Sequence, residues 1–357
     1  MASPSAPGDP ISLVDGALLA FLTDREHRLA EAAPLLGEIG RVVRAGGKRL
    51  RPAFCIWGYR AAGGSDDAAI ARAAAALELL HTFAIIHDDV MDRSPLRRGE
   101  ASSYRELAAT RGVRGDQERF GSSAAILVGD LAVALADELW WSAGFASERH
   151  LAGARVYHAM RAEVIGGQYL DLLAAARGDA TPEETRRISV LKSGRYTVER
   201  PLQIGAALAG AGEDVAGALG TFGAPLGEAF QIRDDVIGAF GDPAETGKDA
   251  YGDIREGKQT LLVALARKTA TPEQRAVLDR HLGEDALDDD GAEAIRTVFR
   301  ETGALDEVLD TIEGLVDAAC DALGRAGLPD EAAGALRALA EQVRQAPSSP
   351  TTARAEG

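Results

Sequence analysis

Three aspartates are spaced so that one face of a helix could carry them all. Asp88, Asp89 and Asp92 follow an apolar run at positions i, i+1 and i+4. At about 100° per residue, Asp92 falls close to both of the others on one helix face. Carboxylates held this close repel one another unless a cation neutralises them, and Mg²⁺ usually binds through such groups together with substrate phosphates. The cluster predicts a magnesium site at the end of a buried helix, and the alternative is a solvated acidic helix end.

A second acidic pair, Asp234-Asp235, has the same layout of apolar helix, two aspartates and loop. Its fifth position is Gly238, so this cluster has one ligand fewer, and Asp242 is a candidate replacement. A solvated helix end is a weaker explanation when the layout occurs twice. We therefore expect both clusters to bind metal.

Lysine is rare in this chain and falls beside the acidic clusters. The chain has 39 basic residues, of which only five are lysine: Lys48, Lys192, Lys248, Lys258 and Lys268. Arginine does not replace lysine where a compact, mobile charge is needed. Arg97-Arg98 follow Pro95, which should end the helix of the first cluster and place the arginines in a loop beside it. Carboxylates, metal and guanidinium groups together would form a diphosphate clamp.

The elements that must position these residues are helices. Apolar residues recur at three-to-four spacing, without period-two runs, over 11–31, 66–91, 121–145, 150–176, 182–209, 213–240 and 304–326. Thr181-Pro182 and Thr271-Pro272 are typical helix starts, each with Glu or Gln three residues after the threonine. We predict one all-α domain over 11–345, between disordered tails at 1–10 and 346–357.

Composition excludes several classes of partner and location. A net charge of −16 argues against nucleic acid as a partner, because binding its phosphates requires a basic surface. The chain has no run of 18 or more apolar residues, so we expect no transmembrane segment. The N-terminus lacks the pattern of a secretory signal. Cys55 and Cys320 lie too far apart in sequence to suggest a disulfide framework or zinc site, which favours a cytoplasmic location.

Taken together and in this order, the motifs resemble those of the trans-type prenyl diphosphate synthases. The resemblance covers residues 40–265 and includes the glycine pair and cations at 46–52, the Lys192-Ser193-Gly194 tripeptide, Phe230-Gln231 before the second pair, and the segment 246–258. It implies a single-domain, isoprenoid-synthase-type helical bundle around a central cavity. It also implies isopentenyl and allylic diphosphate substrates, Mg²⁺ as three ions, and a homodimer.

The resemblance also implies a role for each candidate residue. The metal ligands would be Asp88, Asp89, Asp92, Asp234 and Asp235. The allylic diphosphate would be bound by Arg97, Lys192 and Lys258, with Lys248 nearby. Isopentenyl diphosphate would be bound by Lys48, Arg51, His81 and Arg98. Gln231 would lie near the diphosphates, and Gln168 and Asp171 would line the same cavity. The residues that carry the reaction itself would be Asp88, Asp89, Asp92, Lys192, Asp234 and Lys258.

The implied reaction needs no dedicated protein base. The allylic C–O bond ionises as charge passes onto the diphosphate, the isopentenyl double bond attacks the carbocation, and the departed diphosphate takes the proton. His87, beside the first cluster, is a candidate base, but a packed or hydrogen-bonded histidine is the favoured interpretation.

Product length in similar enzymes depends on residues one turn below the first cluster. Phe83 lies five residues before Asp88, about 7.5 Å down the helix, and its neighbour Ala84 is small. In similar enzymes this pattern suits a C20 product, geranylgeranyl diphosphate, and farnesyl or longer products are the alternatives. Phe83 could equally be core; if it is the cavity floor, Phe83→Ala should lengthen the product.

Three other functions fit the sequence less well. A class I terpene cyclase would need a second motif of Asn or Asp, Ser and Glu at four-residue spacing, which this asparagine-free chain lacks. A non-catalytic subunit of a heteromeric synthase would be expected to have degraded aspartate motifs, yet the first is intact. A purely structural helical protein would not explain two matched clusters with lysines.

Overall fold

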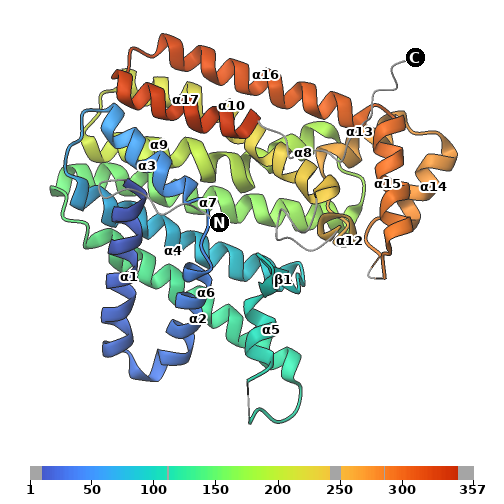
Figure 1. The fold of residues 1–357 in the computed structure, drawn as a ribbon, viewed down its shortest axis with the longest axis horizontal. Coiled ribbons are helices and arrows are strands. Elements are labelled where there is room, and N and C mark those ends of the chain that lie inside the picture. Colours follow the sequence, from blue (N-terminus) through green and yellow to red (C-terminus); the bar gives the residue numbers. More distant parts are fainter. Residues whose placement is uncertain (1–9, 111, 242–250, 285, 345–357) are drawn as a thin grey trace. The chain divides into compact units, whose positions relative to one another are not determined.

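The computed structural model describes residues 10–110, 112–241, 251–284 and 286–344, and these are almost entirely helical (Figure 1). Within these ranges the strands are two short ones, β1 (Leu96–Arg97) and β2 (Glu100–Ala101), paired antiparallel. The predicted all-α class is confirmed. The predicted tails lie outside the described residues, apart from Pro10, which begins the first helix. The last described helix ends at Arg344.

The described chain divides into two compact units. The first comprises 1–157 and 201–216, and the second 158–200 and 217–357. The chain thus passes between units inside helices rather than through linkers: at Tyr157–His158 in α7 (Ser147–Arg177), at Arg200–Pro201 in α9 (Arg200–Ala209) and at Ala216–Gly217 in α10 (Glu213–Phe240). The single domain expected from the sequence stays a prediction.

In the first unit, helix α4 carries the first acidic cluster. The other elements of this unit, besides its parts of α7, α9 and α10 and the two strands, are α1 (Pro10–Arg28), the short 3₁₀ turn η1 (Ala30–Ala32), α2 (Ala33–Arg44), α3 (Leu50–Ala61), α4 (Asp67–Met91), α5 (Ser103–Ala108) and α6 (Gln117–Trp141). Helix α4 begins where the Asp66 side chain accepts a hydrogen bond from the Ala69 N–H at 3.0 Å. It packs against α1, α3 and α6, and its alanines 73–76 are fully buried. Small side chains allow this close packing on several sides, so α4 is the core of the unit.

A buried ion pair ties the loop before α3 to the middle of α4. Arg49 is 8% exposed and has the left-handed φ of 48°. Its Nη1 donates to Glu78 Oε1 at 2.6 Å, its Nε to Asp15 at 2.9 Å, and its Nη2 to the Val43 carbonyl at 2.9 Å. Glu78 is 4% exposed. Burying either charge alone would be costly, so the pair holds the loop in one place.

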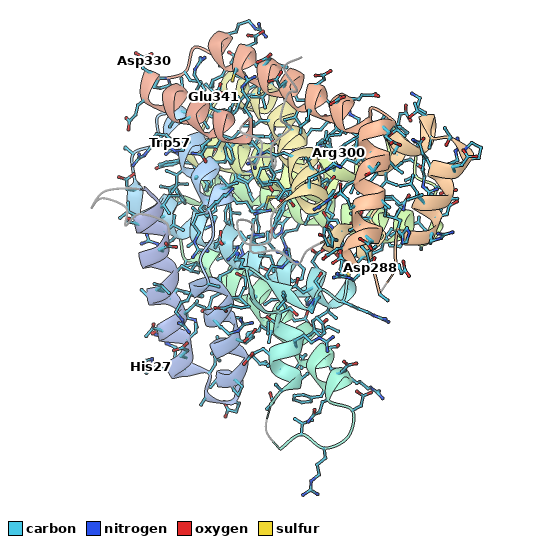
Figure 2. All side chains as sticks on the ribbon, turned by 45° about the vertical axis from the view of Figure 1, so that its right-hand side comes forward. His27, Trp57, Asp288, Arg300, Asp330 and Glu341 are labelled. Carbon is cyan, nitrogen blue, oxygen red and sulfur yellow. The ribbon has the colours of Figure 1, made fainter. Side chains whose placement is uncertain are left out.

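Among its described residues, the second unit contains the second acidic pair and three of the chain's five lysines, Lys192, Lys258 and Lys268. Its elements, besides its parts of α7, α9 and α10, are α8 (Pro182–Ser189), the π-helical segment η2 (Val190–Glu199), α12 (Gly252–Arg255), α13 (Leu261–Thr269), α14 (Pro272–His281), α15 (Asp289–Glu301), α16 (Ala304–Arg325) and α17 (Asp330–Arg344). Helices α16 and α17 pack side by side (Figure 1). On helix α15, Arg300 (labelled in Figure 2) donates a hydrogen bond to the exposed carboxylate of Glu293 at 2.7 Å.

The two predicted threonine helix starts are confirmed. Thr181 Oγ1 accepts from the Glu184 N–H at 3.2 Å, and the Glu184 carboxylate accepts from the Thr181 N–H at 3.0 Å. Thr271 and Gln274 form the same reciprocal pair at the start of α14. Each pair satisfies two N–H groups that a helix start otherwise leaves without partners.

Two helices are long and apolar enough to cross a membrane by length and composition. In α4, 78% of the most apolar window is buried in the protein, as in the core helix of a globular unit. In α6 only 44% is buried. The expectation that no segment would qualify was therefore too strict, although such helices are weak evidence of a membrane span.

We expect Glu78→Ala to lower the free energy of unfolding by about 3 kcal/mol, because it leaves the buried Arg49 charge without its main partner. Urea denaturation followed by circular dichroism measures the change. Asp15→Ala is the matched control: Asp15 is 43% exposed, and its loss should cost less than about 1 kcal/mol. Equal losses for the two variants would show that the buried pair is not the stabilising contact.

Candidate active site

The first acidic cluster lies where helix α4 ends. Asp88 and Asp89 are in the last turn, and Asp92 is the C-terminal capping residue, whose N–H donates to the Asp88 carbonyl at 2.8 Å. Asp89 is 1% exposed. The C-terminal end of a helix already carries partial negative charge, so three carboxylates there raise the demand for a cation. The three aspartates thus lie together at the end of a helix, where the sequence predicted them.

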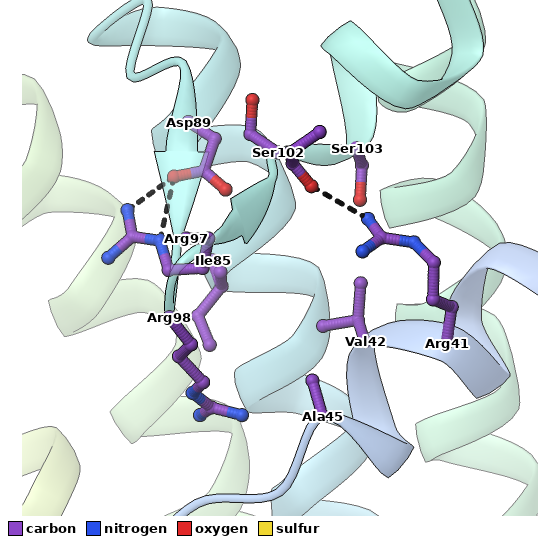
Figure 3. Close-up of a pocket in the computed structure, with 10 residues that line it drawn as sticks. Arg41, Val42, Ala45, Ile85, Asp89, Arg97, Arg98, Ser102 and Ser103 are labelled. Atoms are coloured by element: carbon purple, nitrogen blue, oxygen red, sulfur yellow. Dashed lines mark hydrogen bonds and ion pairs between the residues drawn. The ribbon is translucent and has the colours of Figure 1, made fainter. Parts of the chain in front are cut away.

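The hairpin β1–β2 brings an arginine to this cluster. Arg97 Nε donates to Asp89 Oδ1 at 2.9 Å, its Nη2 contacts the same oxygen, and Nη2 lies 3.7 Å from Asp88 Oδ2. Figure 3 shows the two successive arginines pointing apart, Arg97 toward Asp89 and Arg98 toward Ala45. Arg97, Arg98 and Asp89 line one small recess. The predicted proximity of the arginine pair to the aspartates is confirmed for Arg97.

A second group of cations surrounds His81, two turns before the cluster. Burial lowers the pKa of His81 well below its usual range, and the charges of Arg51, Arg98, Arg97 and Arg49 lower it further. Burial also lowers the pKa of Arg98, and neighbouring arginines add to the effect despite the opposing charge of Glu78. Burial is the larger cause of both shifts, and the charges of the neighbouring arginines act in the same direction. Several guanidinium groups therefore act on one buried imidazole.

The glycine pair before Lys48 permits this grouping. Gly46 and Gly47 have φ of 83° and 149°, which favour glycine. A Cβ at Gly47 would lie 2.9 Å from Arg98 Nη2, so a larger residue would displace the guanidinium. Lys48 itself is exposed. Of the cations in this motif, Arg51 acts on His81 through its charge, whereas Arg49 is tied into the Glu78 pair and has a structural role.

In the second unit, Lys192 pairs with Asp171. Lys192 Nζ donates to Asp171 Oδ2 at 2.7 Å, and the two side chains are 22% and 17% exposed. Lys192 belongs to the π-helical segment η2, a geometry that often marks functional sites. A Cβ at Gly167 of α7 would overlap the Lys192 backbone, so glycine there lets the two helices approach closely. Lys192 and Asp171, which the resemblance assigned to one cavity, are thus in direct contact, while their roles stay predictions.

Around the second acidic pair, negative charge is crowded. Poor solvation raises the pKa of Asp235 well above its usual range, and the charges of Asp253 and Asp234 raise it further. Gln231 Nε2 donates to Asp235 Oδ1 at 2.7 Å and opposes this shift. Helix α10 ends at Phe240, as the segment predicted over 213–240 does, and Asp234 and Asp235 lie in its last two turns. The second pair thus lies slightly farther from its helix end than Asp88 and Asp89 lie from theirs.

Gly238, the missing fifth position, faces another carboxylate. A Cβ at Gly238 would overlap the carboxylate of Asp253. Lys258 Nζ donates to Asp253 Oδ1 at 2.9 Å and lies 2.8 Å from Glu256 Oε2. The sequence analysis assigned no role to Asp253 or Glu256, although both lie within five residues before Lys258. The space of the absent ligand is thus filled by Asp253, while Asp242 and Lys248 lie outside the described residues.

Neither cluster holds a ready-made metal cage. Within the described ranges, no three His, Cys, Asp or Glu side chains are placed to hold an ion by themselves. The donors are nevertheless hard carboxylate oxygens, and three of the carboxylates, those of Asp88, Asp89 and Asp92, lie at the end of α4. This fits Mg²⁺, which keeps several waters and binds through one or two carboxylates plus substrate phosphates.

Comparison with known proteins identifies the family. A model described as polyprenyl synthetase matches residues 34–298. A geranylfarnesyl diphosphate synthase of Aeropyrum pernix is 35% identical over 319 residues, covering 88% of this chain and 92% of the relative. A geranylgeranyl diphosphate synthase of Saccharolobus solfataricus is 35% identical over 267 residues, covering 72% and 74%. The solved geranylgeranyl pyrophosphate synthase of Corynebacterium glutamicum, in complex with isoprenyl diphosphate and magnesium, has 35% identity and a TM-score of 0.91, covering 94% and 98%.

The chain belongs to the polyprenyl synthetase family. It is a prenyltransferase of the trans type, as the motifs indicated. The roles of individual residues stay predictions. The structure brings Arg97 to Asp88 and Asp89, groups Arg51 and Arg98 around His81, and pairs Lys192 and Lys258 with acids, but none of these contacts includes a substrate.

Stability should depend on pH through His81. Because the folded-state pKa of His81 is lowered, below about pH 6.5 the unfolded chain binds a proton that the folded chain does not. The free energy of unfolding therefore decreases as the pH is lowered. We expect His81→Gln to reduce this loss between pH 6.5 and 5 by up to about 1.4 kcal/mol per pH unit, measured by urea denaturation across the range. Arg51→Gln, which removes one neighbouring cation, should give an intermediate loss. Parallel curves for all three proteins would contradict the assignment.

Proposed function

We propose that this prenyltransferase condenses isopentenyl diphosphate with an allylic diphosphate and that geranylgeranyl diphosphate is its main product. The observation that carries the proposal is on helix α4. A carboxylate cluster at its end adjoins Arg97, and two turns earlier several arginines surround a neutral His81. One helix therefore positions both cation-binding and diphosphate-binding groups, which a condensation of two diphosphates requires.

Arg51, Arg98 and His81 bind the isopentenyl diphosphate in this proposal. The lowered pKa values of His81 and Arg98 support the role, because a bound diphosphate would relieve the repulsion among the positive charges. A neutral imidazole can donate one hydrogen bond to a phosphate oxygen without adding a charge. Lys48, which is exposed, would reach the same anion from the glycine loop.

Arg97, Lys192 and Lys258 bind the allylic diphosphate. Each is held by acids, Arg97 by Asp89, Lys192 by Asp171, and Lys258 by Asp253 and Glu256. The acids fix the cations in position, and a diphosphate would form charge-assisted hydrogen bonds to the remaining N–H donors. Gln231 holds Asp235 in its place beside Asp234, and Lys248 would act near this group.

Mg²⁺, as three ions, would be held by Asp88, Asp89, Asp92, Asp234 and Asp235. Bound there, the metal would stabilise the negative charge that develops on the leaving diphosphate. The residues of the chain orient the two diphosphates and neutralise the remaining charge. The solved relative from Corynebacterium glutamicum contains magnesium and isoprenyl diphosphate, which supports this choice. A cytoplasmic location is supported by the free Cys55 and Cys320.

Phe83 and Ala84 set the product length in this proposal. Both are half-buried on α4, a little more than one turn before Asp88, and Phe83 contacts His87. A longer product is the second candidate, because one relative of 35% identity is a geranylfarnesyl diphosphate synthase.

Helix α6 supports a homodimer. Its exposed side chains include Phe120, Ile126, Leu127 and Trp141, which are 41%, 44%, 56% and 55% exposed. Large apolar groups repeated along one helix mark an interaction surface. A second copy of the chain would cover it by pairing the same surface about a twofold axis.

The activity prediction uses isopentenyl diphosphate with each of the C5, C10 and C15 allylic primers and Mg²⁺, with products resolved by chromatography. We expect elongation to C20, its loss on addition of EDTA, and a fall in kcat of about 100-fold or more in Asp88→Ala and Asp234→Ala. Asp310→Ala, at an exposed position of α16, is the control and should keep full activity. No elongation of any primer would refute the proposed function.

The dimer prediction uses sedimentation velocity. The wild type should sediment at about twice the chain mass of 37.4 kDa, and Leu127→Lys should shift the population to monomer because it buries a charge at the contact. Leu13→Lys, a change of the same type at a position of α1 that is 39% exposed, should leave the dimer intact. A monomeric wild type would contradict this prediction.

A further inference from the structure

His87 links the first acidic cluster to the residue that sets product length. It lies on α4 one residue before Asp88 and one turn after Phe83. Its side chain is 19% exposed and leans toward helix α6, where its Nε2 lies 3.0 Å from the Ile126 carbonyl oxygen. As the carbonyl can only accept, Nε2 donates, and this nitrogen is not available as a proton acceptor. The structure thus favours the packed, hydrogen-bonded interpretation of His87 over a catalytic base.

Glycine on α6 makes room for the imidazole. A Cβ at Gly129 would overlap His87 Cδ2 and Nε2, so the ring fits against bare backbone there. The nearest acid, Asp130, has its Oδ1 at 3.8 Å from Nε2, beyond hydrogen-bond distance, and its side chain is 59% exposed. The ring is therefore held by one main-chain hydrogen bond and by a space that only glycine leaves.

The other side of the imidazole contacts Phe83. The ring centroids are 4.7 Å apart and the planes are inclined by 64°, an edge-to-face arrangement. Aromatic pairs prefer this geometry, and losing one changes the population of a ring orientation by about two- to tenfold. Because His87 is anchored to α6, it restricts where the Phe83 ring can lie.

We propose that His87, held by the Ile126 carbonyl and Gly129, is a positioning residue that fixes the orientation of Phe83 and thereby the product length. The inference rests on the proposed function, since it assigns to Phe83 the role of stopping chain growth. It adds two residues, His87 and Gly129, to the determinants of product length, although neither is assigned contact with the growing chain. Both act through Phe83, so their effect should vanish when Phe83 is absent.

The test compares product lengths from His87→Ala, Gly129→Ala and Phe83→Ala, each with the C15 primer, isopentenyl diphosphate and Mg²⁺. Loss of the anchor should raise the share of products longer than the wild-type main product about fivefold in His87→Ala. Gly129→Ala should show a similar shift, because its methyl group displaces the ring. The KM for isopentenyl diphosphate should change less than about twofold in either variant, since its proposed ligands are untouched.

Two further variants separate positioning from a general loss of structure. Gly37→Ala adds the same methyl group to an exposed helical glycine with nothing within 4 Å, and should leave the products unchanged. In the double variant Phe83→Ala with His87→Ala, products should be no longer than in Phe83→Ala alone, as expected for residues that act through one contact. His87→Phe, which keeps a ring beside Phe83, should restore part of the wild-type distribution.

The possible failures are distinguishable. If Phe83→Ala lengthens the product but His87→Ala and Gly129→Ala do not, the positioning role is wrong and the synthase assignment stands. If the double variant makes longer products than Phe83→Ala, His87 acts independently of Phe83 and the proposal is overturned. If the wild type elongates no primer, the proposed function fails and this inference fails with it.

Discussion

Helix α4 concentrates charged and polar groups on a helix that is otherwise buried, and the first unit depends on how their charges are compensated. Glu78, His81, Asp88 and Asp92 recur at three- to seven-residue spacing among alanines and leucines that are almost fully buried. Desolvation penalises each charge unless a partner is supplied. Arg49 supplies it for Glu78, Arg97 supplies part of it for Asp88 and Asp89, and His81 avoids the cost by staying neutral.

This compensation is uneven along the helix, and the unevenness is what suits it to its substrates. The Arg49–Glu78 pair is closed and buried, so it fixes the glycine loop that carries Lys48 and Arg51. Around His81, arginines outnumber acids, and at the end of α4 acids outnumber arginines. A substrate with two phosphates and a bound cation can relieve both imbalances. Binding and electrostatic relief are therefore the same event in this unit.

Much of the fold could be predicted from sequence because the long helices carry an apolar period. The segments predicted over 66–91, 150–176 and 213–240 correspond to α4, α7 and α10 within a few residues. Helices α2, α3, α5, α12, α13, α15 and α17 lie outside the predicted segments, and all of them are shorter than α4, α7 and α10. The π-helical segment η2 has no distinct sequence signal, because its residues also fit an α-helical pattern and tertiary packing decides the geometry.

The site was predictable where chemistry depends on residue type and spacing, and less so where it depends on contacts. The aspartate cluster and the arginine pair could be read directly. The segment predicted over 213–240 also placed the second pair correctly in the last two turns of α10. Asp253 was overlooked because its relation to Gly238 is spatial, fifteen residues apart in sequence. Likewise, the sequence does not show that Arg49 has a structural role and Arg51 does not. That difference comes from the burial of Arg49 beside Glu78, which the sequence of the segment does not reveal.

The hydrogen bond from His87 to helix α6 uses the main chain of Ile126 and not its side chain. The Ile126 side chain, 44% exposed, belongs to the outer surface of the same helix. Mutation can therefore change the side chain at position 126 while the carbonyl group that His87 requires is inherited unchanged. Descendants of this protein are thus free to alter the exposed surface of α6 and to keep the interior beneath it, so the two traits can diverge separately in evolution.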